Sequence, residues 1–136
     1  MKDLSQAWQK YEVAHYLLKT TYPAVKDPKL LITILSNIQT SLNEAMGSLT
    51  SQQLTFREKL AYLQKRGFNI NFIQELQEII EAQQKSPLEF VKQDKYIICN
   101  DNYNLRYLTV DKIKEFLTLN EAFLKEAESI LTENNK

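Results

Sequence analysis

The chain is poor in the residues that build metal centres, disulfide frameworks and phosphate-binding loops. Its 136 residues include one Cys, one His and two Gly. One Cys cannot form an internal disulfide, and one His with one Cys cannot supply the ligands of a closed zinc site or of a di-iron bundle. Gly47 and Gly67 stand alone, so the usual glycine-rich phosphate loop is absent. We therefore predict no metal site and no cofactor.

Neither sign of charge is in excess, because 17 basic side chains balance 17 acidic ones. A formal net charge of zero removes the global attraction that general nucleic-acid binders use, so any contact with nucleic acid must be local. The longest aliphatic cluster, Leu30-Leu31-Ile32, is far shorter than the run of about 20 apolar residues that crosses a bilayer. We expect no signal peptide and no membrane span, and the lone Cys99 favours a cytoplasmic location.

Helical periodicity dominates the first half of the chain. Residues 3–20 place apolar side chains three and four positions apart, which predicts an amphipathic helix that ends before Pro23. Asp27 offers a cap oxygen and Pro28 a preset helical φ, so a second helix is predicted to begin there. Its apolar stripe is the strongest periodic signal in the sequence. The stripe consists of Leu31, Ile34, Leu35, Ile38, Leu42, Ala45, Met46 and Leu49.

The middle of the chain predicts two further helices. Residues 54–66 form an amphipathic pattern that ends at Gly67, and Asn69 is a cap for the helix that follows. The second of these helices is expected to stop near Lys85. Its predicted buried face consists of Phe72, Ile73, Leu76, Ile79 and Ile80.

The helical periodicity is interrupted in the last third of the chain and then resumes. Ser86-Pro87-Leu88-Glu89 has the spacing of a capping box, which predicts a short helix. Residues 95–109 combine β-formers with turn residues and predict a small β-hairpin, after which Thr109 caps a long C-terminal helix. We expect a mainly α fold in which residues 1–136 form one bundle of four to five long helices, with the short helix and the hairpin.

Two groups of reactive side chains have both a structural and a chemical interpretation. Glu75, Glu78 and Glu81 share one side of a predicted helix, where they would bind a hard cation, act as an acid/base pair, or simply form a solvated acidic face. The solvated face is the favoured interpretation, because charges on the polar side of an amphipathic helix are the default. Cys99 would act as a nucleophile only if His15 lowered its pKa, and we favour no catalytic residue.

His15 lies on the apolar stripe of the first predicted helix, beside Tyr11 and one turn beyond Trp8. A histidine in that position is either a general base tuned by burial or a core residue satisfied by one hydrogen bond. We favour the core residue. Trp8, Tyr11 and His15 together form a candidate pocket.

The most suggestive surface runs from residue 85 to residue 107, where cations alternate with tyrosines. Cations that pair with phosphates and rings on which bases stack are the two components of single-strand binding. The favoured alternative is structural, with the tyrosines fastening the hairpin to the bundle and the lysines keeping an edge soluble. The candidate nucleic-acid-binding residues are Lys85, Lys92, Lys95, Tyr96, Tyr103, Arg106 and Tyr107.

The order of elements resembles that of the HEPN group of small helical-bundle domains. The resemblance rests on the aromatic-rich segment 7–18 and on the long helix predicted for residues 28–49, about half of the chain. Active HEPN members carry an Arg followed a few residues later by a His, whereas here the first Arg is Arg57 and the only His is His15. The resemblance therefore implies a catalytically inactive member that serves assembly or binding. The segments 21–23 and 26–31 are also similar to uncharacterised archaeal helical proteins, which implies no function.

These observations favour a non-enzymatic interaction or assembly domain that forms a homo-oligomer or binds a protein partner. The missing catalytic constellations and the broad apolar stripe of residues 31–49 support this prediction. The alternative is an RNA-binding module that uses the basic and tyrosine-rich region of residues 85–107.

Overall fold

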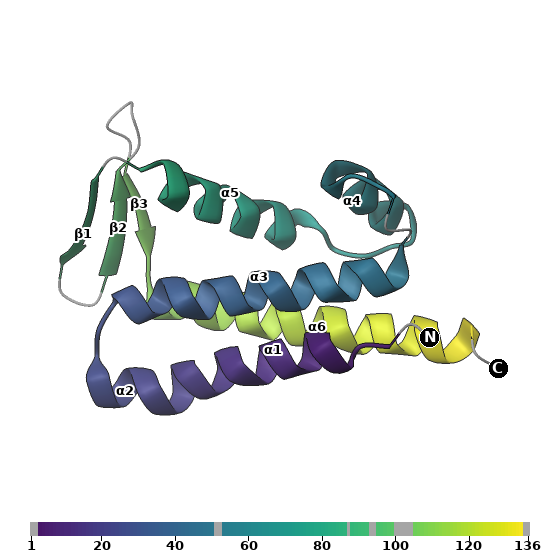
Figure 1. The fold of residues 1–136 in the computed structure, drawn as a ribbon, viewed down its shortest axis with the longest axis horizontal. Coiled ribbons are helices and arrows are strands. Elements are labelled where there is room, and N and C mark those ends of the chain that lie inside the picture. The colour runs from purple at the N-terminus through teal and green to yellow at the C-terminus, as the bar shows by residue number, and fades with distance from the viewer. Residues whose placement is uncertain (1–2, 51–52, 87, 93–94, 100–104, 135–136) are drawn as a thin grey trace.

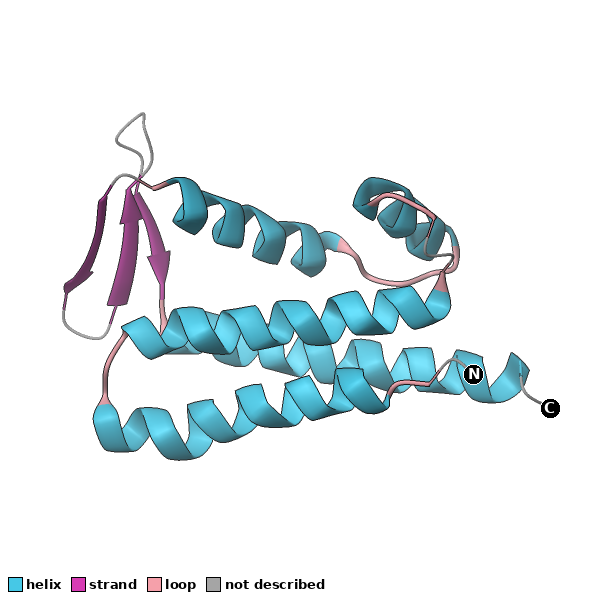
Figure 2. Cartoon of the chain, viewed as in Figure 1, coloured by secondary structure: helices cyan, strands magenta, loops and turns pink. Residues whose placement is uncertain are grey.

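The computed structural model describes residues 3–50, 53–86, 88–92, 95–99 and 105–134 (Figure 1). Helices make up most of these residues, and the strands lie together at one end of the molecule (Figure 2). This confirms the predicted mainly α fold. In chain order the elements are α1 (Ser5–Tyr16), the π-helical segment η1 (Leu17–Thr21), α2 (Tyr22–Val25), α3 (Lys29–Leu49), α4 (Phe56–Lys65), α5 (Asn71–Lys85), β1 (Leu88–Lys92), β2 (Lys95–Cys99), β3 (Leu105–Leu108) and α6 (Val110–Asn134).

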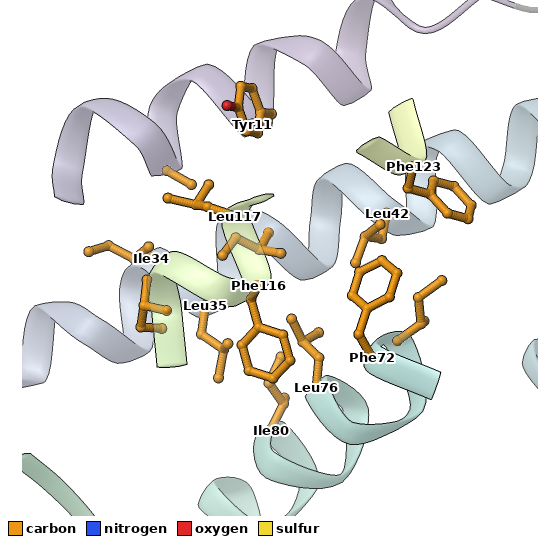
Figure 3. Packing of buried hydrophobic residues seen from close by; sticks show 14 of the residues in the cluster. Tyr11, Ile34, Leu35, Leu42, Phe72, Leu76, Ile80, Phe116, Leu117 and Phe123 are labelled. Atoms are coloured by element: carbon orange, nitrogen blue, oxygen red, sulfur yellow. The ribbon is translucent and has the colours of Figure 1, made fainter. Parts of the chain in front are cut away.

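Helix α3 is the centre of the bundle. It contacts α1, α5 and α6, and the predicted stripe is buried along its whole length except for the half-buried Leu49. Phe116 of α6 points toward Leu35 of α3 and toward Leu76 and Ile80 of α5 (Figure 3). Phe123 joins the other end of this seam, with its ring centroid 4.9 Å from that of Phe68. Burial of these side chains is the main force that holds the layers together.

Most helix ends follow the predicted local chemistry. The Asp27 carboxylate accepts a hydrogen bond from the Lys29 N–H at 3.0 Å, where α3 begins. Thr109 Oγ1 accepts from the Lys112 N–H at 3.2 Å at the start of α6. Gly67 follows α4 with a φ of +92°, a conformation that glycine adopts without the strain of a side chain. The Asp27 and Thr109 contacts satisfy N–H groups that the helices themselves leave unpaired.

The prediction that the first helix ends before Pro23 is wrong. The chain stays helical through η1 and α2 as far as Val25, and Lys26 ends it with a φ of +50°. In η1 the Tyr22 N–H donates to the carbonyl of Leu17, five residues back, so this turn is wider than an α-helical one. Pro23 directly follows this wide turn, at the point where the regular α-helical hydrogen-bond pattern is interrupted.

The strands form one antiparallel sheet in the order β1-β2-β3. The predicted pairing of residues 95–99 with residues 105–108 is confirmed, with Ile97 opposite Tyr107, while the turn between them lies outside the described residues. The prediction of a short helix after Ser86 is wrong, because residues 88–92 form β1. Ser86 Oγ donates instead to the carbonyl of Cys99 at 2.6 Å, so a contact with β2 replaces the expected helix cap.

Candidate functional site

A pocket of about 600 Å³ lies between the first helical segment and α6. This volume is within the range of about 300–1,000 Å³ that is usual for small-ligand sites. The wall from α1, η1 and α2 consists of Tyr11, His15, Leu18, Lys19, Tyr22 and Pro23. The opposite wall, a single stripe along α6, consists of Val110, Lys114, Leu117, Thr118 and Glu121.

Tyr11 and Glu121 connect the two walls at one end of the pocket. The Tyr11 hydroxyl donates a hydrogen bond to Glu121 Oε2 at 2.5 Å, and Lys125 pairs with Glu121 Oε1 at 3.0 Å. Burial raises the pKa of Tyr11 well above its ordinary value, and the bond to Glu121 raises it further. The hydrogen bond from Tyr11 lowers the pKa of Glu121, and the contact with Lys125 lowers it further. At neutral pH the pair is therefore a neutral hydroxyl bound to a carboxylate.

Two of the three predicted pocket residues line this site. Tyr11 and His15 are stacked, with ring centroids 5.8 Å apart and an angle of 30° between the planes. Trp8 is not among the lining residues but meets the Tyr11 ring edge-on at 5.6 Å. His15 is half-buried, so it is neither the fully enclosed core residue that the sequence favours nor a fully exposed one.

The sequence pattern does not predict that the remaining lining residues share a site. They come from segments about a hundred positions apart, since the residues of the Tyr11–Glu121 bond are 110 positions apart in the chain. The recurrence of Val110, Lys114, Leu117 and Glu121 at helical spacing was the only available signal, and it does not say which helix faces this stripe.

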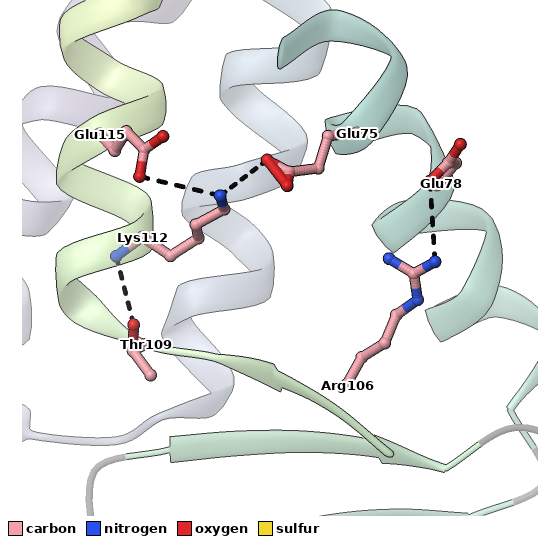
Figure 4. Close-up of polar contacts among 6 residues, drawn as sticks. All are labelled: Glu75, Glu78, Arg106, Thr109, Lys112 and Glu115. Atoms are coloured by element: carbon pink, nitrogen blue, oxygen red, sulfur yellow. Dashed lines mark hydrogen bonds and ion pairs between the residues drawn. The ribbon is translucent and has the colours of Figure 1, made fainter. Parts of the chain in front are cut away.

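Glu75 and Glu78 of α5 form ion pairs that connect this helix to its neighbours (Figure 4). Glu75 pairs with Lys112 at 2.7 Å, and Glu78 pairs with Arg106 of β3 at 3.7 Å. Glu81 accepts a hydrogen bond from Gln77 at 3.1 Å. No cluster of three or more His, Cys, Asp or Glu side chains suited to a metal ion is present in the ranges that the structure describes.

Cys99 and His15 are not brought together in the pocket. Cys99 is buried on β2, while His15 lines the wall formed by α1. Cys99 is not among the lining residues, so the pocket does not hold the thiol and imidazole pair that a cysteine nucleophile would use.

The candidate nucleic-acid-binding residues are divided by the structure. Tyr96 is 4% exposed and belongs to the hydrophobic core, so its ring is not available for stacking on a base. Arg106 is occupied by Glu78, whereas Lys85 is exposed at the end of α5. Tyr103 and the side chain of Lys92 lie outside the described residues. The exposed pair is Lys95 and Tyr107, with Lys95 Nζ 5.7 Å from the centre of the Tyr107 ring.

The sheet has two different faces. Tyr96, Ile98 and Leu108 belong to the core that packs on the helices. Alternate residues of a strand point to opposite sides, so Ile97 and Tyr107, which are paired across β2 and β3, point away from that core. Figure 2 shows the three strands side by side at one end of the molecule, with the helices extending away from them. We define the outward sheet face by the residues Lys95, Ile97, Cys99, Leu105 and Tyr107.

No described helix has the length and hydropathy of a membrane span. Comparison with protein-family models, with curated proteins and with solved structures found no match. The resemblance to HEPN domains therefore stays a prediction.

Proposed function

We propose that this chain is a non-enzymatic interaction domain that associates with a second copy of itself through the outward sheet face. The observation that carries the proposal is the exposure of Leu105 and Tyr107, which are 45% and 53% exposed on β3. They follow one another on the same side of an edge strand, next to the buried Ile97. Neighbouring exposed apolar side chains of this kind are typical of surfaces that bind another protein.

A second copy is the partner that fits this face best. The face carries one described cation, Lys95, whose charge lies over the Tyr107 ring, and the whole chain has no net charge. Two copies therefore meet without overall repulsion, and an apolar patch is complementary to itself about a two-fold axis. The resemblance to HEPN domains, many of which dimerise, points in the same direction.

The test is analytical ultracentrifugation over a wide concentration range. We expect reversible dimerisation that the substitution Leu105→Glu weakens roughly tenfold, because the new carboxylate would be buried in the interface without a partner. Tyr16→Glu is the matched control, since Tyr16 is 60% exposed on α1 and lies outside the outward sheet face. A wild-type chain that stays monomeric at every concentration, or a dimer that Leu105→Glu leaves intact, would contradict the proposal.

RNA binding is the second candidate, and the Lys95–Tyr107 pair is the observation that favours it. The pair places an ammonium and an exposed ring within reach of one nucleotide. Binding of single-stranded RNA would weaken as salt is raised and would be reduced by Lys95→Ala. Binding that is absent at low salt would dismiss this candidate.

A further inference from the structure

The pocket between α1 and α6 has features that the association of two chains does not use. Its centre is apolar, with Leu18 and Leu117 on opposite walls. Charged residues line the pocket as well: Glu121 is acidic, and Lys19 and Lys114 are basic. No ion pair joins either of these lysines to another residue in the part of the chain that the structure describes.

The positions of the two lysines follow from the directions of the helices. Figure 1 shows α1 and α6 running antiparallel, with both termini at the same end. The Tyr11–Glu121 hydrogen bond fixes their register. Lys19 lies eight residues beyond Tyr11 along its wall, and Lys114 lies seven residues before Glu121 along the other wall, about 10 Å at about 1.5 Å per residue. The positions of Lys19 and Lys114 along their helices therefore lie toward the same end of the pocket, and Glu121 lies toward the other end.

We propose that this pocket binds a small amphipathic monoanion, an aliphatic carboxylate whose head group pairs with Lys19 and Lys114 and whose chain lies between Leu18 and Leu117. The two cations attract one negative charge, and the apolar walls replace water around the chain of the ligand. Glu121 is already ionised and bound by Tyr11 and Lys125. A second negative charge on the ligand would meet that carboxylate, so a dianion of the same length is disfavoured.

The wide turn of η1 forms part of this wall. Leu18 and Lys19 both belong to η1, and Tyr22 and Pro23 follow it directly. A π-helical turn interrupts the regular packing of a helix against its neighbour and is frequently found at functional sites. The departure from regular helix therefore coincides with the lysine end of the pocket.

Calorimetric titration with three eight-carbon probes tests the proposal. Octanoate is expected to bind more tightly than octan-1-ol, which lacks the charge, and more tightly than octanedioate, which carries a second one. Replacing both cations, Lys19→Met with Lys114→Met, is expected to weaken octanoate binding about fivefold or more and to leave octanol binding unchanged. Lys10→Met is the matched control, because Lys10 is on α1 but does not line the pocket.

A second variant tests whether the probes bind in this pocket, independently of the lysine charges. Thr118 is exposed on the α6 wall, so Thr118→Trp fills the pocket without changing the core and is expected to abolish binding of octanoate and octanol alike. The proposal is overturned if octanoate fails to bind, if octanedioate binds equally well, or if the double lysine variant keeps full affinity. These substitutions lie outside the outward sheet face, so the result is independent of whether the chain dimerises.

Discussion

Two seams of the molecule use polar groups in opposite ways. Between α1, α3 and α6, Asn120 donates to Ser41 Oγ at 3.1 Å, and Ser41 donates to the carbonyl of Ala7 at 2.8 Å, all in fully buried positions. Between α5, β3 and α6, the described residues include the ion pairs of Lys112 and Arg106, whose side chains are 28% and 45% exposed.

The difference between the two seams shows that burial determines how much a polar contact contributes to the stability of the fold. A buried hydroxyl or amide that loses its partner has no water to replace it, whereas an exposed ion pair exchanges one set of solvated contacts for another. We therefore expect the α1–α3–α6 seam to be the more rigid of the two and to hold the walls of the pocket in place. The seam between α5 and the sheet is expected to depend on apolar packing more than on its charges.

The largest effect is expected where the two seams meet, at Leu35. This side chain is fully buried on α3 and faces Phe116 of α6 (Figure 3). Leu35→Ala should lower the free energy of unfolding by about 3 kcal/mol, through lost burial and the cavity left behind. Chemical denaturation followed by circular dichroism measures it. A loss below about 1 kcal/mol would show that the core collapses around the site and that the two seams are not joined there.

The next largest effect is expected in the buried polar network. Ser41→Ala leaves the Asn120 amide and the Ala7 carbonyl without this hydroxyl and should cost about 2 kcal/mol. Ser48→Ala is the control on the same helix, because the Ser48 hydroxyl also bonds a carbonyl, that of Asp3 at 2.8 Å, but in an exposed position. Equal losses of unfolding free energy in Ser41→Ala and Ser48→Ala would show that burial does not determine how much these polar contacts contribute.

The Tyr11–Glu121 bond at the pocket is intermediate, and Tyr11→Phe should cost about 1 kcal/mol at neutral pH. The contribution of this bond to the stability of the fold changes in both acid and alkaline solution. The lowered pKa of Glu121 stabilises the fold above the ordinary glutamate pKa of about 4.3, and this is lost as pH falls through the lower value in the fold. The raised pKa of Tyr11 stabilises the fold below about pH 10, and this is lost as pH rises beyond that value.

Unfolding curves of the wild type and Tyr11→Phe, recorded across the pH range, test this dependence. The stability difference between the two proteins should be greatest from about pH 5 to pH 9 and shrink in both acid and alkali. A difference that stays constant from acid to alkali would mean that the hydroxyl acts through packing and not through its bond to the Glu121 carboxylate.

The smallest effect is expected at the partly exposed ion pairs between α5 and its neighbours. Lys112 contacts Glu75 and Glu115, and its ammonium lies 5.2 Å from the centre of the Phe116 ring. Lys112→Met keeps the apolar stem and should cost about 0.5 kcal/mol, less at high salt. A loss as large as that of Ser41→Ala, unchanged by salt, would contradict the comparison of the two seams.

The sequence was sufficient for the long helices and insufficient for segments that depend on a distant partner. The stripe from Leu31 to Leu49 repeats over many turns, so local periodicity alone located α3. Residues 88–92 match a helix start in isolation but form a strand, because pairing with β2 outweighs the local signal. The helical path through Pro23 was missed because the wide turn of η1 leaves no mark in the apolar pattern.

The same distinction explains the candidate site. Tyr11 and His15 were found because they interrupt an apolar stripe with polar atoms, a feature that is visible within one helix. Lys19 and Lys114 are not predicted, because they line one pocket only through the antiparallel packing of α1 and α6. Pairing of distant helices is a tertiary property, so a single sequence predicts which face is buried better than what that face meets.

The most direct test of the proposed association is a ¹H–¹⁵N correlation spectrum of the chain recorded over a dilution series. We expect dilution to shift the amide signals of residues 95–99 and 105–108, while the signals of the pocket walls on α1 and α6 stay fixed. Spectra that do not change with concentration, or changes confined to α1 and α6, would contradict it.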